Sequence, residues 1–215
     1  MENPRFVITI GRQFGSGGRE LGRRLADMFA IPYYDKELIA EASKESGIDP
    51  EYFEKADEKT PGSLIRALTA NLMMSGGAVG AENALAGENI FKFQSDVIRE
   101  VARAGSCVIV GRCADYILRN EPICISTFVY ASDDDRIDRV MRCHGAKTPK
   151  EAMEMMRKTD KKRAGYYNFY TDKCWGAAAS YDLCIDSSVL GIEKTAELIR
   201  SYVEQRIQAV VEAAE

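Results

Sequence analysis

The sequence predicts a doubly wound α/β fold, in which helices cover both faces of a parallel sheet. Short, β-branched apolar runs alternate along the chain with longer segments of helical spacing. The apolar runs are continuous rather than alternating, which is typical of strands buried on both faces. The chain has 215 residues, of which 46% are hydrophobic and 29% charged, and these values fit one compact domain.

Strand and helix assignments follow directly from these patterns. Four runs are predicted to be strands: Arg5–Ile10, Ser106–Gly111, Ile123–Ala131 and Tyr181–Asp186. Five segments are predicted to be helices: Arg19–Phe29, Ile90–Ala104, Asp133–Cys143, Pro149–Tyr166 and Gly191–Ala213. Ligands of such folds bind beyond the carboxyl ends of the strands, so the segments that follow each strand are the first place to look for a site.

Two regions fit the alternating plan less well. The segment Asp35–Gly87 contains acidic helical stretches, and the glycine-rich run Met74–Asn89 has little to bury and is predicted to be mobile. The segment His144–Asp172 is helical, basic and aromatic, and is interpreted as a second insert. Both regions interrupt the core of the predicted sheet.

Overall charge and composition exclude several functional classes. A net charge of -4 and a pI near 5.3 argue against a protein that binds duplex nucleic acid, so no nucleic-acid partner is expected. The six cysteines form no C-x-x-C pair and there is a single histidine, which disfavours zinc and disulfide frameworks. The first residues resemble no leader, and no run reaches membrane-spanning length. We therefore expect a cytoplasmic protein without membrane contacts, and the oligomeric state stays open.

The stretch IGRQFGSGGREL, residues 10–21, follows the first predicted strand and opens a helix. In this context successive backbone N–H groups and the helix N-terminus form an anion site. Gly15, Gly17 and Gly18 permit close approach of the backbone to a phosphate, and Ser16 can add a hydroxyl. We therefore predict phosphate binding, the alternative being a glycine-rich turn without a ligand.

The loop departs from the phosphate-binding pattern G-x-x-x-x-G-K-[ST]. When Gly17 is aligned with the second glycine, Arg12 occupies the place of the first glycine and Gly18 the place of the lysine. Arg19 or Arg12 could reach the β and γ phosphates instead. The preferred hypothesis is that Arg19 replaces the lysine and that Glu20, on the first helical turn, ligates Mg²⁺ through a hard oxygen.

Several segments together make the chain similar to the cytidylate kinases, and more closely to a divergent cytidylate kinase-like group. These are the loop and, in order, IPYYDKELI, VGRCADYI, YASDDDRIDRVM, TDKKRA and YDLCIDSSVLGIEKTAELI, from Val7 to about Ile199. The resemblance implies a P-loop NTPase-type doubly wound parallel sheet with monophosphate-binding and lid inserts. It implies a single kinase-like domain with a core of 1–34, 88–144 and 173–215, an acceptor-binding insert at 35–87 and a lid at 145–172.

The same resemblance implies transfer of the γ-phosphoryl group of ATP, with Mg²⁺, to CMP or dCMP. By position, the segment Gly15–Arg19 would cradle the donor phosphates, and Arg136 and Arg139 would face the donor from a lid-side helix. The acceptor would be contacted by a second set of residues, namely Asp35, Arg112, Asp160 and Arg163. The family's loop lysine, magnesium-side threonine and two aspartates correspond here to Gly18, Glu20, Val110 and Cys113. Asp115 could reach the base in place of the second aspartate.

Physical reasoning supports part of this assignment independently. Phosphoryl transfer depends on positioning and on stabilising the charge of the equatorial oxygens, so it needs cations from several elements in one cleft. The candidates are Arg12, Arg19, Arg112, Arg139 and Arg163, and all but Arg12 are predicted to be catalytic. Three alternatives stay open: a phosphotransferase for another small acceptor, a nucleotide-binding protein without catalysis, and a structural or interaction protein.

Overall fold

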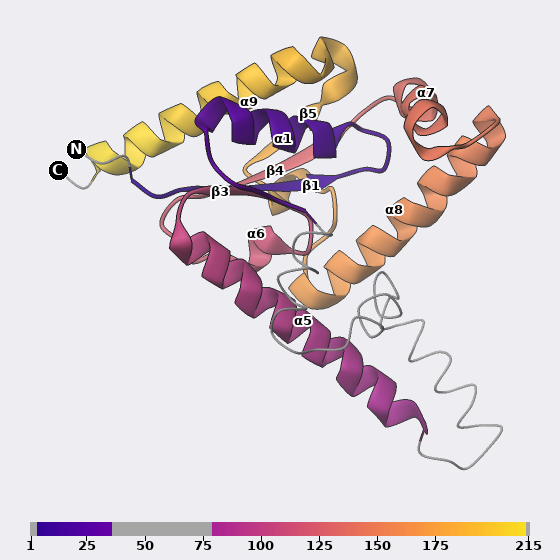
Figure 1. The fold of residues 1–215 in the computed structure, drawn as a ribbon, viewed down its shortest axis with the longest axis horizontal. Coiled ribbons are helices and arrows are strands. Elements are labelled where there is room, and N and C mark those ends of the chain that lie inside the picture. Colours follow the sequence, from indigo (N-terminus) through magenta and orange to yellow (C-terminus); the bar gives the residue numbers. More distant parts are fainter. Residues whose placement is uncertain (1–3, 36–78, 214–215) are drawn as a thin grey trace.

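The sheet of this protein consists of parallel strands in the order β2-β3-β1-β4-β5 (Figure 1). The structure is a computed structural model and describes residues 4–35 and 79–213. The strands are β1 (Val7–Arg12), β2 (Tyr33–Tyr34), β3 (Cys107–Val110), β4 (Cys124–Tyr130) and β5 (Leu183–Asp186). In the centre, Val7 pairs with Cys107 on one side and Cys124 on the other, which brings the carboxyl ends of β1, β3 and β4 to one edge.

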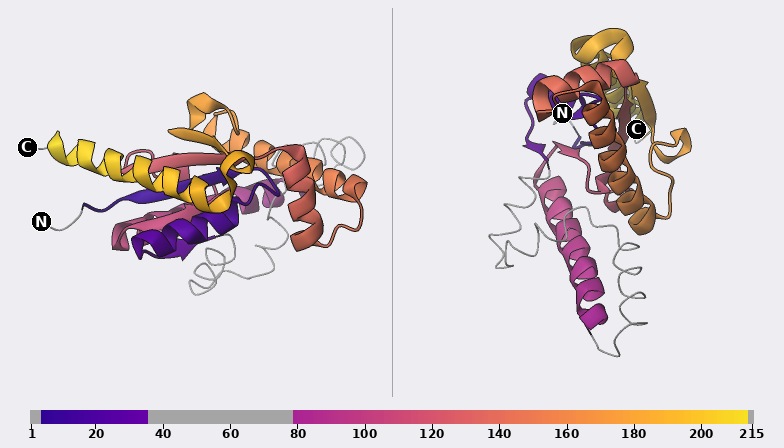
Figure 2. Two further views of the ribbon diagram at one scale, coloured as in Figure 1. Left: turned by 90° about the horizontal axis from the view of Figure 1, so that it is seen from above. Right: turned by 90° about the vertical axis from the view of Figure 1, so that its right-hand side faces the viewer.

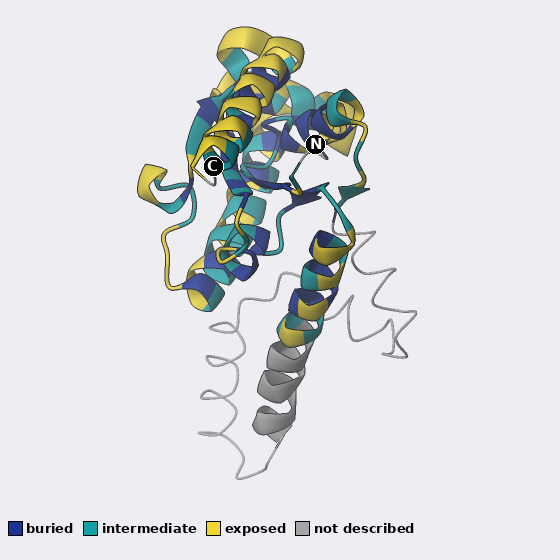
Figure 3. Cartoon of the chain, turned by 90° about the vertical axis from the view of Figure 1, so that its left-hand side faces the viewer, coloured by how far each residue is buried: buried dark blue, intermediate teal, exposed yellow. Residues whose placement is uncertain are grey.

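Helices cover both faces of the sheet, so the predicted doubly wound fold is confirmed (Figures 1 and 2). Helices α1 (Gly18–Phe29) and α9 (Ser187–Glu212) pack on one face, and α5 (Val79–Ala104) and α6 (Ala114–Ile117) on the other. Alternate residues of β1 explain this arrangement, since Ile8 and Ile10 join the core under α1 and α9 while Val7 joins the core under α5. Buried residues therefore follow the strands, and exposed residues lie on the outer helical surfaces (Figure 3).

Two further helices lie beyond the carboxyl edge of the sheet, α7 (Asp133–His144) and α8 (Pro149–Thr171), and they pack against each other (Figure 1). Each begins at a hydroxyl cap, because the Ser132 Oγ accepts from the Asp135 N–H at 3.2 Å and the Thr148 Oγ from the Glu151 N–H at 3.2 Å. Both helices were predicted, although α8 continues to Thr171 rather than ending at Tyr166. The structure thus places a helical pair over the strand ends.

Helix α5 begins at Val79, eleven residues before the predicted start at Ile90. Of the segment Met74–Asn89, which was predicted to be mobile, residues 79–89 are helical, and residues 74–78 lie outside the part that the structure describes. Alanine, leucine and glutamate dominate this stretch and favour helix strongly enough to include two glycines. The boundary expected between the insert and the core at residue 88 consequently falls within one helix.

Short elements and helix breaks account for the remaining differences. Strand β2 and helix α6 were not predicted, since two and four residues are too few for a periodic pattern. Helix α9 begins at Ser187, but it contains a non-helical Gly191 with φ 71° and ψ 173°, which is the residue where the helix was predicted to start. Within the described ranges, no helix has the length and apolarity needed to cross a membrane.

Candidate active site

Two adjoining cavities open at the carboxyl edge of the sheet. The larger measures about 590 Å³ and is lined by the loop before α1 together with residues of α7 and α8. The smaller measures about 70 Å³ and is lined by the ends of β1 and β3, by α8, and by aromatic side chains that include Trp175 and Tyr181. Arg12 and Arg163 line both cavities. Ligands in the two cavities would therefore meet at these two arginines.

The loop between β1 and α1 has the backbone shape of a phosphate cradle. Gly15 and Gly17 adopt left-handed φ values of 81° and 80°. A Cβ at Gly15 would lie 2.9 Å from the Arg136 carbonyl oxygen, and one at Gly17 would lie 2.4 Å from Ile192 Cδ1, so both positions require glycine. Gly17 caps α1 without a side-chain hydrogen bond, which leaves the first N–H groups of the helix available to an anion.

Ser16 supports the shape of this loop from the inside. Its side chain is fully buried, and its Oγ donates to the Gln13 carbonyl at 3.0 Å. Its own carbonyl accepts from the Ser187 Oγ at 2.7 Å. We predicted a hydroxyl directed at a phosphate, but the side chain of Ser16 lines neither of the two cavities. The sequence carried no signal for the contact with Ser187, which joins residues 171 positions apart.

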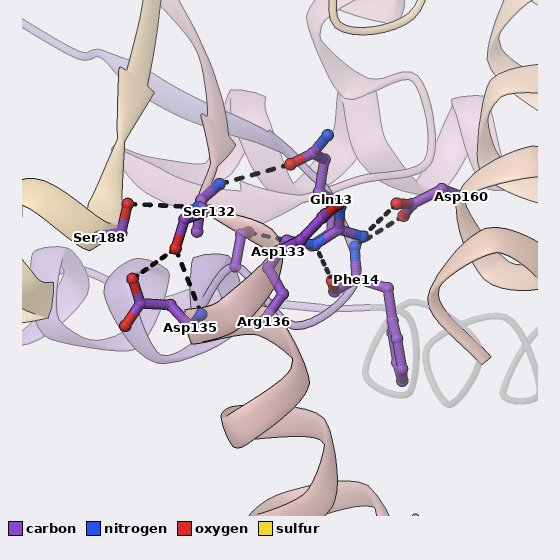
Figure 4. A network of polar contacts seen from close by, with 10 residues as sticks. Gln13, Phe14, Ser132, Asp133, Asp135, Arg136, Asp160 and Ser188 are labelled. Atoms are coloured by element: carbon purple, nitrogen blue, oxygen red, sulfur yellow. Dashed lines mark hydrogen bonds and ion pairs between the residues drawn. The ribbon is translucent and has the colours of Figure 1, made fainter. Parts of the chain in front are cut away.

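Arg136 and Asp160 fasten the outer side of the loop, and we call this pair the Arg136–Asp160 clamp (Figure 4). The two side chains form an ion pair, Arg136 Nε donates to the Phe14 carbonyl at 2.8 Å, and the Phe14 N–H donates to Asp160 at 2.7 Å. Arg136 also lies 3.4 Å from Asp133. Both residues were predicted to bind nucleotide, but the structure directs them toward each other and away from the lining of both cavities.

Arg12 crosses the inner side of the loop. Its side chain passes over Gly18, where a Cβ would lie 2.6 Å from Arg12 Cβ. Its guanidinium ends on Gly111, where a Cβ would lie 2.0 Å from Arg12 Nη1. Burial, and then the charges of Arg163, Arg112 and Arg19, lower the pKa of Arg12 to about 9, so this side chain is still a cation at pH 7.

The chain turns sharply after β3, where three successive residues are left-handed. Gly111 has a φ of 83°, Arg112 of 58° and Cys113 of 55°. For residues other than glycine this conformation costs on the order of 1–3 kcal/mol each, and such strain concentrates at functional sites. The turn places Arg112, a predicted catalytic residue, in the lining of the smaller cavity beside Arg12.

Two other predicted arginines reach the loop from the helical pair. Arg163 of α8 donates from Nη1 to the Arg12 carbonyl at 3.1 Å, and its guanidinium lies 5.5 Å from the centre of the Phe14 ring. Arg139 of α7 donates from Nη1 to the Gly15 carbonyl at 2.9 Å. The structure thus brings Arg139 and Arg163 to the loop before α1, where each donates to one loop carbonyl.

Arg19 lies against Asp35 at the end of β2. Its Nε is 3.6 Å from Asp35 Oδ2, and Arg23 Nη2 is 3.9 Å from the same oxygen, while the Tyr33 hydroxyl donates to it at 3.3 Å. Asp35 is buried, and the Arg19 side chain is 48% exposed. The structure therefore directs the side chain that we expected to replace the lysine toward a carboxylate.

The larger cavity favours a polyanion. Of the described residues that line it, one is acidic, Glu20, and five are arginines: Arg12, Arg19, Arg23, Arg139 and Arg163. Among the described residues no group of three histidine, cysteine or acidic side chains could hold a metal ion without further ligands. Mg²⁺ is commonly held by one or two carboxylates together with phosphate oxygens, so Glu20 and a bound polyphosphate fit this ion.

The smaller cavity contains a carboxylate, Asp115, in a wall made of both basic and aromatic side chains. The Tyr167 hydroxyl donates to Asp115 Oδ2 at 2.7 Å. Burial raises the pKa of Asp115, an effect that the Tyr167 hydrogen bond and Lys173 reduce. Burial and the neighbouring Asp115 also raise the pKa of Tyr167. The structure thus places Asp115 and Arg112, both predicted to bind the acceptor, in one cavity, and it adds Tyr181, which sequence reasoning missed.

Comparisons with known proteins agree with this arrangement. A family profile described as the cytidylate kinase-like family matches residues 7–189. A crystal structure of an uncharacterized protein from Eubacterium ventriosum is 31% identical, with 93% of this chain and 99% of that chain covered and a TM-score of 0.71. The comparison with curated proteins gives no significant match.

More distant solved structures share the fold. A shikimate kinase from Acinetobacter baumannii in complex with shikimate is 14% identical, with 95% of each chain covered and a TM-score of 0.52. A gluconokinase from Sinorhizobium meliloti is 11% identical, with 98% of each chain covered and a TM-score of 0.53. At these identities the likeness shows a common fold.

Proposed function

The chain belongs to the cytidylate kinase-like family, and we propose that it transfers the γ-phosphoryl group of ATP to a small anionic acceptor, with CMP and dCMP as the first candidates. The observation that carries this proposal is the shared boundary of the two cavities, which Arg12 and Arg163 both line. A phosphoryl group passing from a donor in one cavity to an acceptor in the other would cross this boundary. Cations at that point would stabilise its charge.

Donor binding is assigned to the larger cavity. The open N–H groups at the start of α1 would bind phosphate oxygens, and the left-handed glycines let the backbone approach them closely. Arg139 and Arg163 come from different helices and would add charge-assisted hydrogen bonds to the same phosphates. Mg²⁺ bound with ATP would neutralise charge on the phosphate oxygens, and Glu20 is the residue placed to hold it.

Acceptor binding is assigned to the smaller cavity, where Arg112 supplies a cation and Asp115 an acceptor of hydrogen bonds. For a nucleoside monophosphate, Arg112 would bind the acceptor phosphate and Asp115 the amino group of the base. The small volume of about 70 Å³ favours a second candidate, a compact hydroxyl-bearing anion. Asp115 would then orient the hydroxyl and take its proton, because burial raises the pKa of this carboxyl.

The proposal is tested by incubating the protein with Mg-ATP and each of CMP, dCMP, UMP, AMP, GMP and shikimate, and following new phosphorus NMR signals. Conversion of CMP or dCMP would support the first candidate, and conversion of shikimate alone would support the second. Arg112→Ala should lower turnover about 10²- to 10³-fold, as expected for a lost charge-stabilising donor. Arg119→Ala, on the exposed surface after α6, is the matched control.

Absence of turnover with every acceptor in the series would contradict both candidates. Thermal stabilisation by Mg-ATP would then identify a nucleotide-binding protein without catalysis, because a ligand that binds only the folded state raises its stability. Absence of stabilisation as well would leave a structural or interaction protein.

A further inference from the structure

We infer that Arg12 has exchanged places with the missing loop lysine, so that its guanidinium binds the phosphoryl group at the boundary between the two cavities. This inference rests on the proposed function. It differs from the hypothesis that Arg19 replaces the lysine. It also explains why residue 18 is a glycine.

The exchange is visible in the sequence pattern. In G-x-x-x-x-G-K-[ST] the first position has no side chain and the seventh carries a long cation. In this chain the first position is Arg12 and the seventh is Gly18, so the cation and the glycine have traded positions. The loop keeps one long cationic side chain and one vacated position.

Packing between the two residues explains why the changes occur together. A Cβ at Gly18 would lie 2.6 Å from Arg12 Cβ and 3.0 Å from Arg12 Cγ, and both distances are too short for a side chain at position 18. The next neighbour of that Cβ is Val129 Cβ at 3.6 Å, an ordinary contact. Gly18 is the first residue of α1, so its backbone is helical and tolerates any side chain. Of the three atoms nearest that Cβ, only the two of Arg12 are closer than an ordinary contact, so Arg12 disfavours any side chain at position 18.

The end point of the Arg12 side chain indicates its partner. The guanidinium lies against Gly111, where the absence of a Cβ and a φ of 83° make room for it. Arg12 lines both cavities at this point. Within the described ranges the Arg12 guanidinium forms no ion pair with a carboxylate, whereas Arg19 lies 3.6 Å from Asp35. The charges that act most strongly on Arg12 are those of Arg163, Arg112 and Arg19. Positive charges that lie close together repel one another, and an anion bound among them would offset this repulsion.

A planar guanidinium suits this position because it donates two parallel hydrogen bonds to the oxygens of one phosphate. In the transfer, the bond between the γ phosphorus and the oxygen that bridges it to the β phosphorus breaks, and its electron pair stays on ADP. A new bond forms between the γ phosphorus and an acceptor oxygen. Arg12 keeps its protons throughout and only stabilises charge on the transferred group.

A double-mutant cycle tests the exchange directly. The proteins compared are the wild type, Arg12→Gly, Gly18→Lys and the double variant, which restores the glycine at the first position of the pattern and the lysine at the seventh. The readouts are the rise in Tm with inorganic tripolyphosphate and the rate of phosphoryl transfer from Mg-ATP. Each single variant should show a smaller tripolyphosphate effect and a rate lowered about 10²- to 10³-fold, Arg12→Gly because one of the five arginines of the larger cavity is gone and Gly18→Lys because the new side chain collides with Arg12. The double variant should recover at least part of both.

The inference is overturned if Arg12→Gly responds to tripolyphosphate and turns over like the wild type, or if the double variant is no better than the single variants. If the variants at Gly18 do not fold by circular dichroism, Arg12→Met and Arg12→Lys decide instead, since both keep the packing stem. Arg12→Met should weaken the tripolyphosphate response, and Arg12→Lys should keep more of it than Arg12→Met. An equal response in both variants contradicts the inference.

Failure of the inference and failure of the proposed function give different results. Suppose that tripolyphosphate raises the Tm of the wild type without any turnover, and that this rise is weaker in Arg12→Met. This result supports Arg12 as part of the anion site and contradicts the kinase proposal. Turnover that survives in Arg12→Met contradicts the inference alone. A wild type with no response and no turnover contradicts both. Arg24→Met, on the exposed face of α1 and outside the lining of both cavities, is the matched control.

Discussion

Two arginines on opposite sides of the loop before α1, Arg136 and Arg12, have different surroundings. On the outer side, Arg136 is 5% exposed and is held by Asp160, Asp133 and the Phe14 carbonyl, so its charge is neutralised within the protein (Figure 4). On the inner side, Arg12 is half-buried among other arginines and lines two cavities. The difference separates an arginine that is paired within the fold from the arginine that we propose to bind an anion.

The largest expected effect comes from breaking the outer side. Arg136→Met should lower the free energy of unfolding by about 3–5 kcal/mol, because it leaves Asp160 partly buried without its cation. Urea denaturation followed by circular dichroism measures this change. Arg142→Met, an exposed position on the same helix, should change stability by less than about 0.5 kcal/mol. Equal stabilities of the two variants would show that the clamp does not hold the loop.

The inner cavity can be probed through the pH dependence of Asp115. Because burial raises the pKa of Asp115 in the folded protein, the folded state binds more protons than the unfolded state between the unfolded pKa of about 3.9 and the folded pKa. Stability should therefore fall as pH rises through this window, by at most about 1.4 kcal/mol per pH unit. Asp115→Asn should lack this loss in denaturation experiments at a series of pH values. A wild type that gains stability relative to Asp115→Asn as pH rises would contradict the prediction.

Helix α7 carries Arg136 of the clamp, and the cap of this helix offers a milder test of the outer side. Ser132→Ala removes the hydroxyl that accepts from the Asp135 N–H and should cost about 1 kcal/mol of stability. Ser132→Thr keeps a hydroxyl that can accept from the Asp135 N–H and donate to Asp135 Oδ2, and should retain most of the stability. Urea denaturation measures the free energy of unfolding of both variants. Equal losses of stability in the two would argue against the cap as the cause.

The smallest effect is expected from removing the inner cation in the absence of ligand. Arg12→Met keeps the stem that packs over Gly18 and removes a charge that neighbouring arginines repel. Its free energy of unfolding should differ from that of the wild type by less than about 1 kcal/mol. The same substitution thus gives a large loss at residue 136 and a small change at residue 12. A loss at Arg12 as large as that at Arg136 would show that Arg12 also holds the fold.

Most elements of the fold could be predicted because their signals are local. Apolar runs such as Ile123–Ala131 and the helical spacing of Asp133–Cys143 correspond to β4 and α7 within two residues. The start of α5 was missed because glycines were weighted above the helix-forming residues around them. Strand β2 was missed because a two-residue strand exists only through its pairing with β3.

The sequence names candidate site residues, but it does not separate those that line a cavity from those that pair with one another. Sequence placed Arg136 and Asp160 at the nucleotide, and nothing local reveals that both bind the backbone of Phe14, from which Asp160 is separated by 146 positions. Likewise Arg19 stands next to the vacated lysine position, yet its guanidinium lies beside Asp35 after β2. Proximity along the chain was a poor guide because side-chain direction depends on which partner is nearest in space.

Sequence alone was therefore sufficient for the doubly wound sheet, for the loop after β1 and for the family to which the chain belongs, since hydrophobic period, glycine spacing and motif order are properties of the chain. Only the tertiary structure decided which arginine is neutralised by a carboxylate and which faces a cavity. The physical reason is that the energy of a buried charge depends on its partners in space. For Arg12 and Arg136 those partners are supplied by strand ends and helices remote in sequence.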